Sequence, residues 1–274
     1  MLRSMYSGIG GMRGFQNKLD VIGNNIANVN TAGFKKSRVM FSDILSQTMA
    51  GGNAPGNIGG TNPKQIGLGS TISAIDVVHT QGGNMTTGIE TDLAIQGNGF
   101  FVVSGNSTAP GDEFYLTRAG NFKIDAAGNL VTPEGKFVLD SSGVAINIPD
   151  YDKVKSISIA PTGEITITTD TGVTAGQTIG IAKVNNPSGL EKAGSNLYKV
   201  VGSANGAVLG LTDITKAAAV DGRGLIAAGT LEMSNTDLSE EFTEMIVAQR
   251  GFQANSRIIT TSDSILEELV NLKR

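Results

Sequence analysis

Apolar side chains near the N-terminus recur with a helical period. Along residues 2–29 their mean spacing is about 3.4, close to the 3.5 of a coiled coil and far from the 2 of a strand. Five glycines interrupt this stripe, and each costs up to about 1 kcal/mol relative to alanine inside a helix. The pattern therefore predicts a helix that needs a packing partner, whose backbone the bare glycines allow to approach closely. These glycines are Gly8, Gly10, Gly11, Gly14 and Gly23.

A second stripe lies at the other end of the chain. From Leu238 to Leu272 the apolar spacing is again about 3.4 and predicts a helix of roughly 50 Å at 1.5 Å per residue. Asp237 and Glu240 open it with the spacing of a capping box, and only Gly251 interrupts it. The two helices most simply pair with each other. Their surplus apolar edge predicts contact with neighbouring copies of the chain.

Between the two stripes the chain changes character. Residues 50–70 are dense in Gly, Asn and Pro and predict a loop or extended linker. Residues 71–230 contain short β-type runs, such as EITITT, separated by turn sequences such as PTGE. We therefore expect an α+β fold with a mainly antiparallel β-domain inserted between paired, coiled-coil-like terminal helices. The expected parts are a helical core domain of 1–30 plus 237–274, a linker or joint of 31–70, and a β-rich outer domain of 71–236.

Composition narrows the possible functions. A net charge of -4 argues against a nucleic-acid binder, which normally presents a basic face. No apolar run approaches the roughly 18 residues of a membrane span, and the N-terminus lacks the continuous apolar region of a cleaved secretory signal. Cysteine is absent, so the chain has no disulfides and no thiolate metal site. These features are compatible with the cytosol or with export of an unfolded chain.

The residues offer little for catalysis. His79 is the single histidine, and without cysteines it does not indicate a zinc site, so we interpret it as an ordinary strand or surface residue. No serine lies in a G-x-S-x-G nucleophile elbow. We expect no enzyme, no cofactor or metal and no small-molecule ligand, and keep a glycan-active enzyme and a secreted binding module as weaker alternatives. Two groups of charges are interpreted as caps or solvated faces: Lys35, Lys36 and Arg38, and the pairs Glu240–Glu241 and Glu267–Glu268.

Long motifs in this chain resemble a known family. The asparagine-rich segment NNIANVNTAGFKKSR, residues 24–38, closely resembles the motif of the bacterial flagellar axial proteins, the rod and hook group. The segments LTRAGNFKIDAAGNLVTPEGKFVL and GTLEMSNTDLSEEF resemble further blocks of that family in the same order. The resemblance covers nearly the whole chain. It implies a structural subunit of a tubular helical polymer, which leaves the cell unfolded by the flagellar type III route without a cleaved signal.

The resemblance also suggests a place within the family. The linker sequence and short length are similar to the compact hook type of Gram-positive bacteria, with the distal rod protein as the alternative. A hook subunit would link the rod to the filament at the cell exterior and transmit torque. The implied partners are further copies of the chain, the distal rod, hook cap and hook–filament junction proteins, and the type III export apparatus.

Three groups of residues are candidates for function. The asparagine motif is expected to end the first helix and fix the turn into the linker through local side-chain bonds, although simple helix capping is an alternative. Phe41 and Leu45 resemble the export-gate motif of rod and hook subunits and would share one side of a helical turn formed on binding, although they could instead pack the linker against the β-domain. The joint motif comprises Asn24, Asn25, Asn28, Asn30, Gly33 and Phe34. Packing between helices and between subunits is assigned to Phe15, Leu19, Ile22, Phe242, Met245, Phe252 and Leu269.

Overall fold

The structure is a computed structural model and forms two compact units. Each is described by itself, as the helical unit and the β unit. The predicted α+β class, with paired terminal helices and a mainly antiparallel β-domain between them, is confirmed. The helical unit comprises Met1–Ala27, Ser37–Val77 and Asp237–Arg274, and the β unit Asn28–Lys36 and Val78–Thr236. The described residues are 2–52, 54, 59–106, 114–149, 154–169, 172–205 and 215–272.

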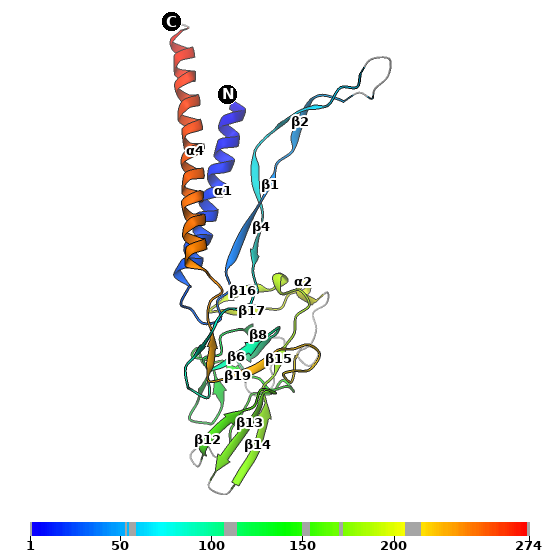
Figure 1. Ribbon diagram of the computed structural model, residues 1–274, viewed down its shortest axis with the longest axis vertical. Helices are drawn as coiled ribbons and strands as arrows, with labels where there is room; N and C mark the ends of the chain where they lie inside the picture. The colour runs from blue at the N-terminus through cyan, green and yellow to red at the C-terminus, as the bar shows by residue number, and fades with distance from the viewer. Residues whose placement is uncertain are drawn as a thin grey trace. The chain divides into compact units, whose positions relative to one another are not determined.

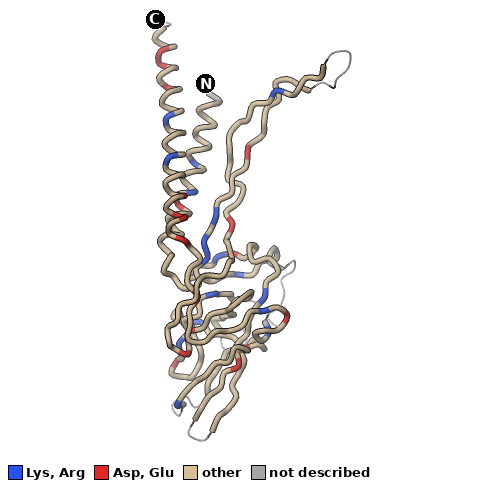
Figure 2. The backbone as a smooth tube through the Cα atoms, viewed as in Figure 1, with Lys and Arg blue, Asp and Glu red and all other residues tan. Residues whose placement is uncertain are grey.

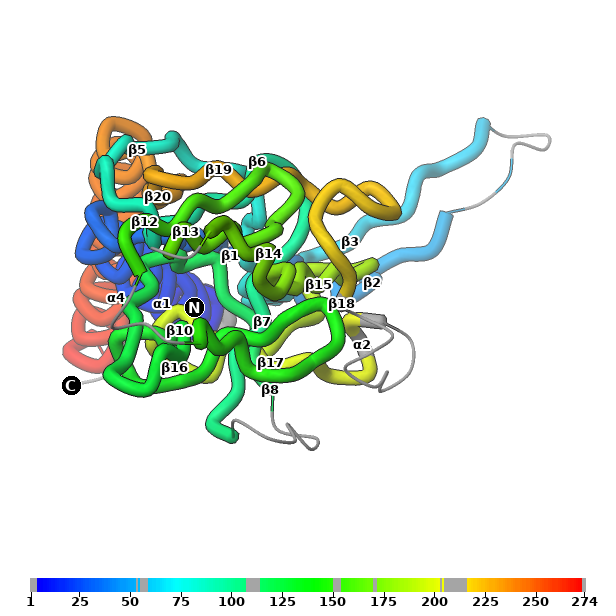
Figure 3. The backbone as a smooth tube through the Cα atoms, turned by 90° about the horizontal axis from the view of Figure 1, so that it is seen from below, coloured from blue at the N-terminus to red at the C-terminus, as the bar shows by residue number. Residues whose placement is uncertain are grey.

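Two long helices dominate the helical unit. Helix α1 (Leu2–Ala27) and helix α4 (Leu238–Asn271) lie side by side and antiparallel (Figures 1 and 3). The predicted cap of α4 is confirmed, because the Asp237 carboxylate accepts hydrogen bonds from the backbone N–H groups of Ser239 and Glu240. Neither helix, within the described ranges, is long and apolar enough to cross a membrane.

Glycines allow these helices to approach closely, as predicted. A methyl group added at Gly11 would lie 2.9 Å from the Asn255 side-chain nitrogen. On the opposite helix, a methyl group at Gly251 would lie 2.5 Å from the Phe15 ring. Gly23, by contrast, has nothing within 4 Å of such a group. At these contacts, a side chain of the neighbouring helix occupies the space that a larger residue would need.

A β-ribbon accompanies the helices in the helical unit. Strand β1 (Ser37–Asp43) pairs antiparallel with β4 (Ser70–Val77), and β2 (Ser46–Ala50) pairs with β3 (Lys64–Gly67). Much of the segment predicted as an extended linker thus satisfies its backbone groups by pairing with its own return. Residues 53 and 55–58 of that segment lie outside the described residues. Every residue of β2 and β3 is exposed, so this end of the ribbon has no apolar cover.

Antiparallel sheets build the β unit. The main sheet has the order β16-β17-β8-β7-β11-β10-β9, with β15 also pairing to β7 and to β18. A three-stranded sheet, β12-β13-β14, and two pairs, β19-β6 and β20-β5, complete it. Short helical segments lie at Pro187–Gly189 (η2) and Gly202–Asn205 (α2). The strands are β5 (Asn84–Thr86), β6 (Leu93–Gln96), β7 (Phe100–Ser104), β8 (Phe114–Thr117), β9 (Lys123–Ile124), β10 (Leu130–Val131), β11 (Phe137–Val138), β12 (Val154–Ile159), β13 (Glu164–Thr169), β14 (Gly172–Thr178), β15 (Ile181–Ala182), β16 (Glu191–Gly194), β17 (Leu197–Lys199), β18 (Thr215–Lys216), β19 (Leu225–Ala228) and β20 (Thr230–Glu232).

Strand β7 explains why the β unit has two apolar cores. All five of its residues are buried, and successive side chains of a strand point to opposite faces. Phe101 and Val103 join one core cluster, whereas Phe100 and Val102 join the other. A strand covered on both faces reads as a continuous apolar run, which accounts for the FFVV sequence.

Candidate functional site

The asparagine motif divides between the two units, and its first buried member is Asn25 on α1. Asn25 is 2 % exposed, and its amide both donates to the Ser37 carbonyl (2.9 Å) and accepts from the Ser37 N–H (3.0 Å). It also donates to the Glu241 carboxylate on α4 (3.2 Å). The prediction of a solvated Glu241 is wrong, because this carboxylate is buried at 5 % exposure against the Asn25 amide. Asn24 and Asn30 are exposed.

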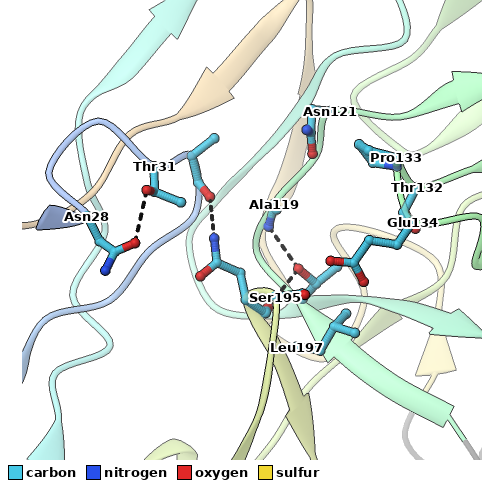
Figure 4. A pocket seen from close by; sticks show the side chains of 12 residues that line it. Asn28, Thr31, Ala119, Asn121, Thr132, Pro133, Glu134, Ser195 and Leu197 are labelled. Atoms are coloured by element: carbon cyan, nitrogen blue, oxygen red, sulfur yellow. Dashed lines mark hydrogen bonds between the residues drawn. The ribbon is translucent and has the colours of Figure 1, made fainter. Parts of the chain in front are cut away.

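Residues 28–36, the asparagine loop, belong to the β unit. The Thr31 hydroxyl donates to the Asn28 side-chain oxygen (3.1 Å), a local bond of the kind predicted for the motif (Figure 4). Gly33 adopts φ +70°, and a methyl group there would lie 2.5 Å from the Ala119 nitrogen. Only glycine suits this position, because both the backbone conformation and the space exclude a side chain. The asparagine loop therefore packs directly against the rest of the β unit.

A cavity of about 380 Å³ lies beside the asparagine loop. Its wall is fixed by hydrogen bonds, since the Asn196 amide donates to the Ala32 carbonyl (3.0 Å) and the Thr117 hydroxyl donates to the Asn196 carbonyl (3.0 Å) (Figure 4). Hydroxyl, amide and small apolar groups make up most of the lining, which Glu134 joins with a carboxylate. The lining residues are Asn28, Thr31, Ala32, Thr117, Ala119, Asn121, Thr132, Pro133, Glu134, Ser195, Asn196 and Leu197.

Behind the loop lies a buried charged cluster of Lys35, Arg118 and Glu232. The Glu232 carboxylate is 1 % exposed and receives Lys35 Nζ at 2.5 Å on one oxygen and Arg118 at 3.1 Å on the other. Lys35 also donates to the Thr80 carbonyl (2.7 Å) and Arg118 to the Gly97 carbonyl (2.7 Å). The cluster thus joins the asparagine loop, the segment after β8 and the end of β20.

The interpretation of Lys35 as part of a solvated patch is wrong. This ammonium group is 1 % exposed, and burial lowers its pKa, while the hydrogen bond that it donates to Glu232 opposes that shift. Its counter-ion lies 197 residues away in sequence, so no local pattern marks it. Arg38 does fit the earlier interpretation, because its side chain is 61 % exposed and lies 3.8 Å from the Asp76 carboxylate.

His79 lies between β4 and β5 and is half-buried, so the prediction of an ordinary strand or surface residue is not met. Both ring nitrogens are buried, and within the described residues neither has a hydrogen-bond partner. The rings of Phe100 and Tyr198 contact it edge-on, at centroid distances of 5.6 and 5.5 Å. Burial lowers the pKa of His79 to about 4, which the nearby Pro187 carbonyl only slightly opposes. The positive charges that lower it further are those of Lys35, Arg118 and Lys192.

The residues assigned to packing fall into two sets. On α1, Ile22 is buried at 4 % exposure, and the ring of Phe15 packs against Gly251. On α4 three of the assigned side chains are exposed, Phe242 by 50 %, Phe252 by 37 % and Leu269 by 50 %. Leu19 and Met245 are half-buried.

Small residues form several contacts of α4 with α1, together with Ile259, which lies beside Gly8. Ala248 is fully buried, Ser262 is 8 % exposed, and Asn255 contacts Gly11. Asn255 and Ser262 interrupt the apolar stripe in the sequence. They lie in the buried seam because large side chains would hold the helices apart.

The two residues of the export motif lie on the β-ribbon. Phe41 is 40 % exposed, and its ring contacts Phe15 at a centroid distance of 5.9 Å. A methyl group added at Gly14 would lie 2.8 Å from the Phe41 ring. Leu45 is 82 % exposed. The structure therefore packs Phe41 on helix α1 and leaves Leu45 open.

Three protein-family descriptions match this chain. Residues 5–35 match "Flagella basal body rod protein", residues 94–167 match "Flagellar hook protein FlgE/F/G D1 domain", and residues 227–272 match "Flagellar basal body rod FlgEFG protein C-terminal". Together they cover more than half of the chain, and they include the asparagine motif, the central strands and most of α4.

Individual relatives extend over the full length. The chain is 54 % identical to the flagellar basal-body rod protein FlgG of Bacillus subtilis and 37 % identical to FlgG of Borreliella burgdorferi, each alignment covering 100 % of both chains. It is 28 % identical to the flagellar hook protein FlgE of Treponema pallidum, again with both chains covered completely. That alignment spans 474 positions, against 274 residues here, so the hook protein carries a large insertion.

The charged cluster predicts a large loss of stability when Glu232 is neutralised. Glu232→Gln leaves two buried cations facing each other without a counter-ion, so we expect it to lower the free energy of unfolding by about 3–5 kcal/mol. Asp76→Asn is the matched control, because it breaks an exposed pair and should cost less than about 1 kcal/mol. Urea unfolding followed by circular dichroism measures both. Equal effects of the two variants would contradict the structural role of the cluster.

His79 predicts a specific acid sensitivity. Its pKa is about 4 in the folded chain and about 6.5 when unfolded, so its contribution to stability is complete above pH 6.5 and is lost as the pH falls toward 4. We expect His79 to account for about 2–3 kcal/mol of the stability lost over that range. His79→Phe keeps an aromatic ring without a titrating group and should remove that share. The midpoints of urea unfolding at pH 7, 5.5 and 4 test this prediction. If the midpoint falls with pH equally in the unchanged chain and in His79→Phe, the prediction is wrong.

Proposed function

The chain belongs to the flagellar rod and hook protein family, and we propose that it is the distal rod subunit of the basal body, self-assembling with copies of itself. The identity of 54 % to a rod protein over the full length of both chains carries this assignment. Members of the family are structural proteins of the flagellar axis and not enzymes.

The hook subunit is the second candidate, since hook proteins also align with the entire chain. Identity to them is 27–28 %, half of the value for the rod relative. The insertion of the hook proteins has no counterpart in this chain. We therefore prefer the distal rod subunit, the alternative in the sequence analysis, to the hook subunit. The hook cap and hook–filament junction proteins would be partners only if the chain were a hook subunit.

Localisation tests the choice between rod and hook. We expect gold-labelled antibodies against the β unit to bind the rod of isolated basal bodies with hooks attached. Labelling distributed along the hook would support the second candidate and contradict the first. Antibodies against a known hook subunit provide the matched control in the same particles.

Exposed apolar residues of α4 support a role in assembly. Besides the assigned Phe242, Phe252 and Leu269, the same helix exposes Ile246 by 59 % and Val247 by 58 %. Large apolar side chains exposed together on a soluble protein commonly mark an interaction surface. We propose that neighbouring copies cover these side chains in the polymer. The segment 31–70, with the asparagine motif, would then act as the joint between the helical core and the outer part of the subunit.

Phe252→Ala should prevent polymer formation and leave the β unit folded. Truncating a phenylalanine that becomes buried costs about 3 kcal/mol or more, which corresponds to a rise of about 100-fold in the concentration needed to polymerise. Electron microscopy at increasing protein concentration measures this, with circular dichroism as the test of folding. Gln249→Ala, an exposed polar change on the same helix, is the control. Tubes at the wild-type concentration would count against the role of Phe252.

The export motif yields a separate prediction. If Phe41 and Leu45 engage the export gate, the Phe41→Ala, Leu45→Ala double variant should accumulate in the cell, with at least tenfold less secreted subunit, because an unfolded chain is recognised only through local features. If they only pack the ribbon, secretion stays normal and assembly fails. Immunoblots of cell and medium fractions distinguish these outcomes. Met49→Ala, which alters another exposed apolar residue of the ribbon, is the control.

A further inference from the structure

The seam between α1 and α4 contains few features that define one register. Both apolar stripes repeat about every 3.4 residues, so a shift of one helix by seven residues brings similar side chains opposite each other. The contact of Gly11 with Asn255 would be reproduced nearly as well after such a shift, since Ala248 or Ser262 would replace Asn255. The fit of Phe15 against Gly251 opposes a shift, and a specific polar contact would add to it in excluding other alignments.

Asn25 and Glu241 provide such a contact. The two side chains are 2 % and 5 % exposed and meet at 3.2 Å across the seam. A shift of seven residues would separate the Glu241 carboxylate from the Asn25 amide, and a buried polar group that loses its partner is unfavourable. The Lys18–Glu244 ion pair discriminates less, because its side chains are 20 % and 47 % exposed and can follow a shift through water.

The Asn25 amide is itself held in place. It binds both the N–H and the carbonyl of Ser37, the first residue of β1, which fixes its orientation and the end of α1. Glu241 is similarly placed by the first turn of α4, where its N–H donates to the Asp237 carbonyl (3.0 Å). Both partners are therefore held at defined positions in the native alignment.

We propose that the Asn25–Glu241 pair sets the register of α1 against α4. A buried polar pair acts here as a single polar position does in a coiled coil, where it specifies alignment at some cost in stability. The register decides which apolar side chains of α4 remain exposed. That consequence for assembly rests on the proposed function, whereas the register itself is a property of the single chain.

Disulfide mapping can test the register directly, because the chain has no cysteine. Gly11→Cys with Asn255→Cys reports the native register, since these residues are in contact. Gly11→Cys with Ser262→Cys, or with Ala248→Cys, reports a shift of seven residues. Seven residues span about 10 Å of helix, too far for a disulfide without such a shift. In the otherwise unchanged chain we expect only the 11–255 disulfide.

The decisive variant replaces the pair by apolar residues. With Asn25→Leu and Glu241→Leu we expect at least tenfold more of the shifted disulfides and less of the native one. Asn24→Leu with Glu240→Leu makes the same changes one residue earlier on each helix, at exposed positions, and should leave the native disulfide dominant. If the decisive variant forms shifted disulfides no faster than this control, the proposal is wrong.

A second variant covers loss of folding. If the double leucine variant loses its helical circular dichroism, Glu241→Leu alone decides, since Asn25 then keeps its bonds to Ser37. We expect this variant to form shifted disulfides at least threefold above the unchanged chain. An unchanged disulfide pattern in a folded Glu241→Leu protein would overturn the proposal.

Discussion

Compensation of the Glu232 carboxylate is the constraint on which the β unit depends. A carboxylate with 1 % exposure must have its charge neutralised and its oxygens hydrogen-bonded. Lys35 and Arg118 do so from positions 197 and 114 residues away, and the Gly82 N–H adds a third bond at 3.0 Å. Glu232 therefore brings the asparagine loop, the segment after β4 and the central strands to one place. Neighbouring hydrogen bonds join the same segments, such as the one from the Lys36 N–H to the Asn235 side-chain oxygen (2.8 Å).

The helical unit follows a different principle. Its seam combines glycine, alanine and short polar side chains with Phe15 and Ile259, whereas several large apolar side chains of α4 are exposed. Such a seam brings two helices close, while the exposed apolar side chains of α4 contribute little hydrophobic stabilisation to the isolated pair. An assembly in which copies cover each other's exposed side chains would supply the missing part. Charges stabilise α4 itself. Its first turns contain Glu240, Glu241 and Glu244, and the helix dipole favours acidic side chains there (Figure 2).

The proposed assembly and the proposed register both concern the exposed face of α4. If the register shifted by seven residues, the side chains directed to solvent would move along the helix relative to the rest of the subunit. A polymer of identical subunits requires the same surface on each copy. One buried polar pair near the start of α4 would therefore affect every contact made further along it.

The sequence by itself determined the α+β class, the two terminal helices and their pairing, the Asp237 cap and the membership of the rod and hook family. These follow from periodicities of 3.4 and 2 residues, from turn chemistry and from long motifs, all of which are local properties of the chain. Tertiary structure alone decided that Lys35 and Glu241 are buried, that His79 lies between aromatic rings, and that Asn255 and Ser262 lie in the seam while Phe252 does not. The physical reason is that burial of a charge depends on a counter-ion or amide supplied from a distant segment. The local sequence pattern predicts that charged residues such as Lys35 and Glu241 are solvated, because a charge without a partner is most stable in water.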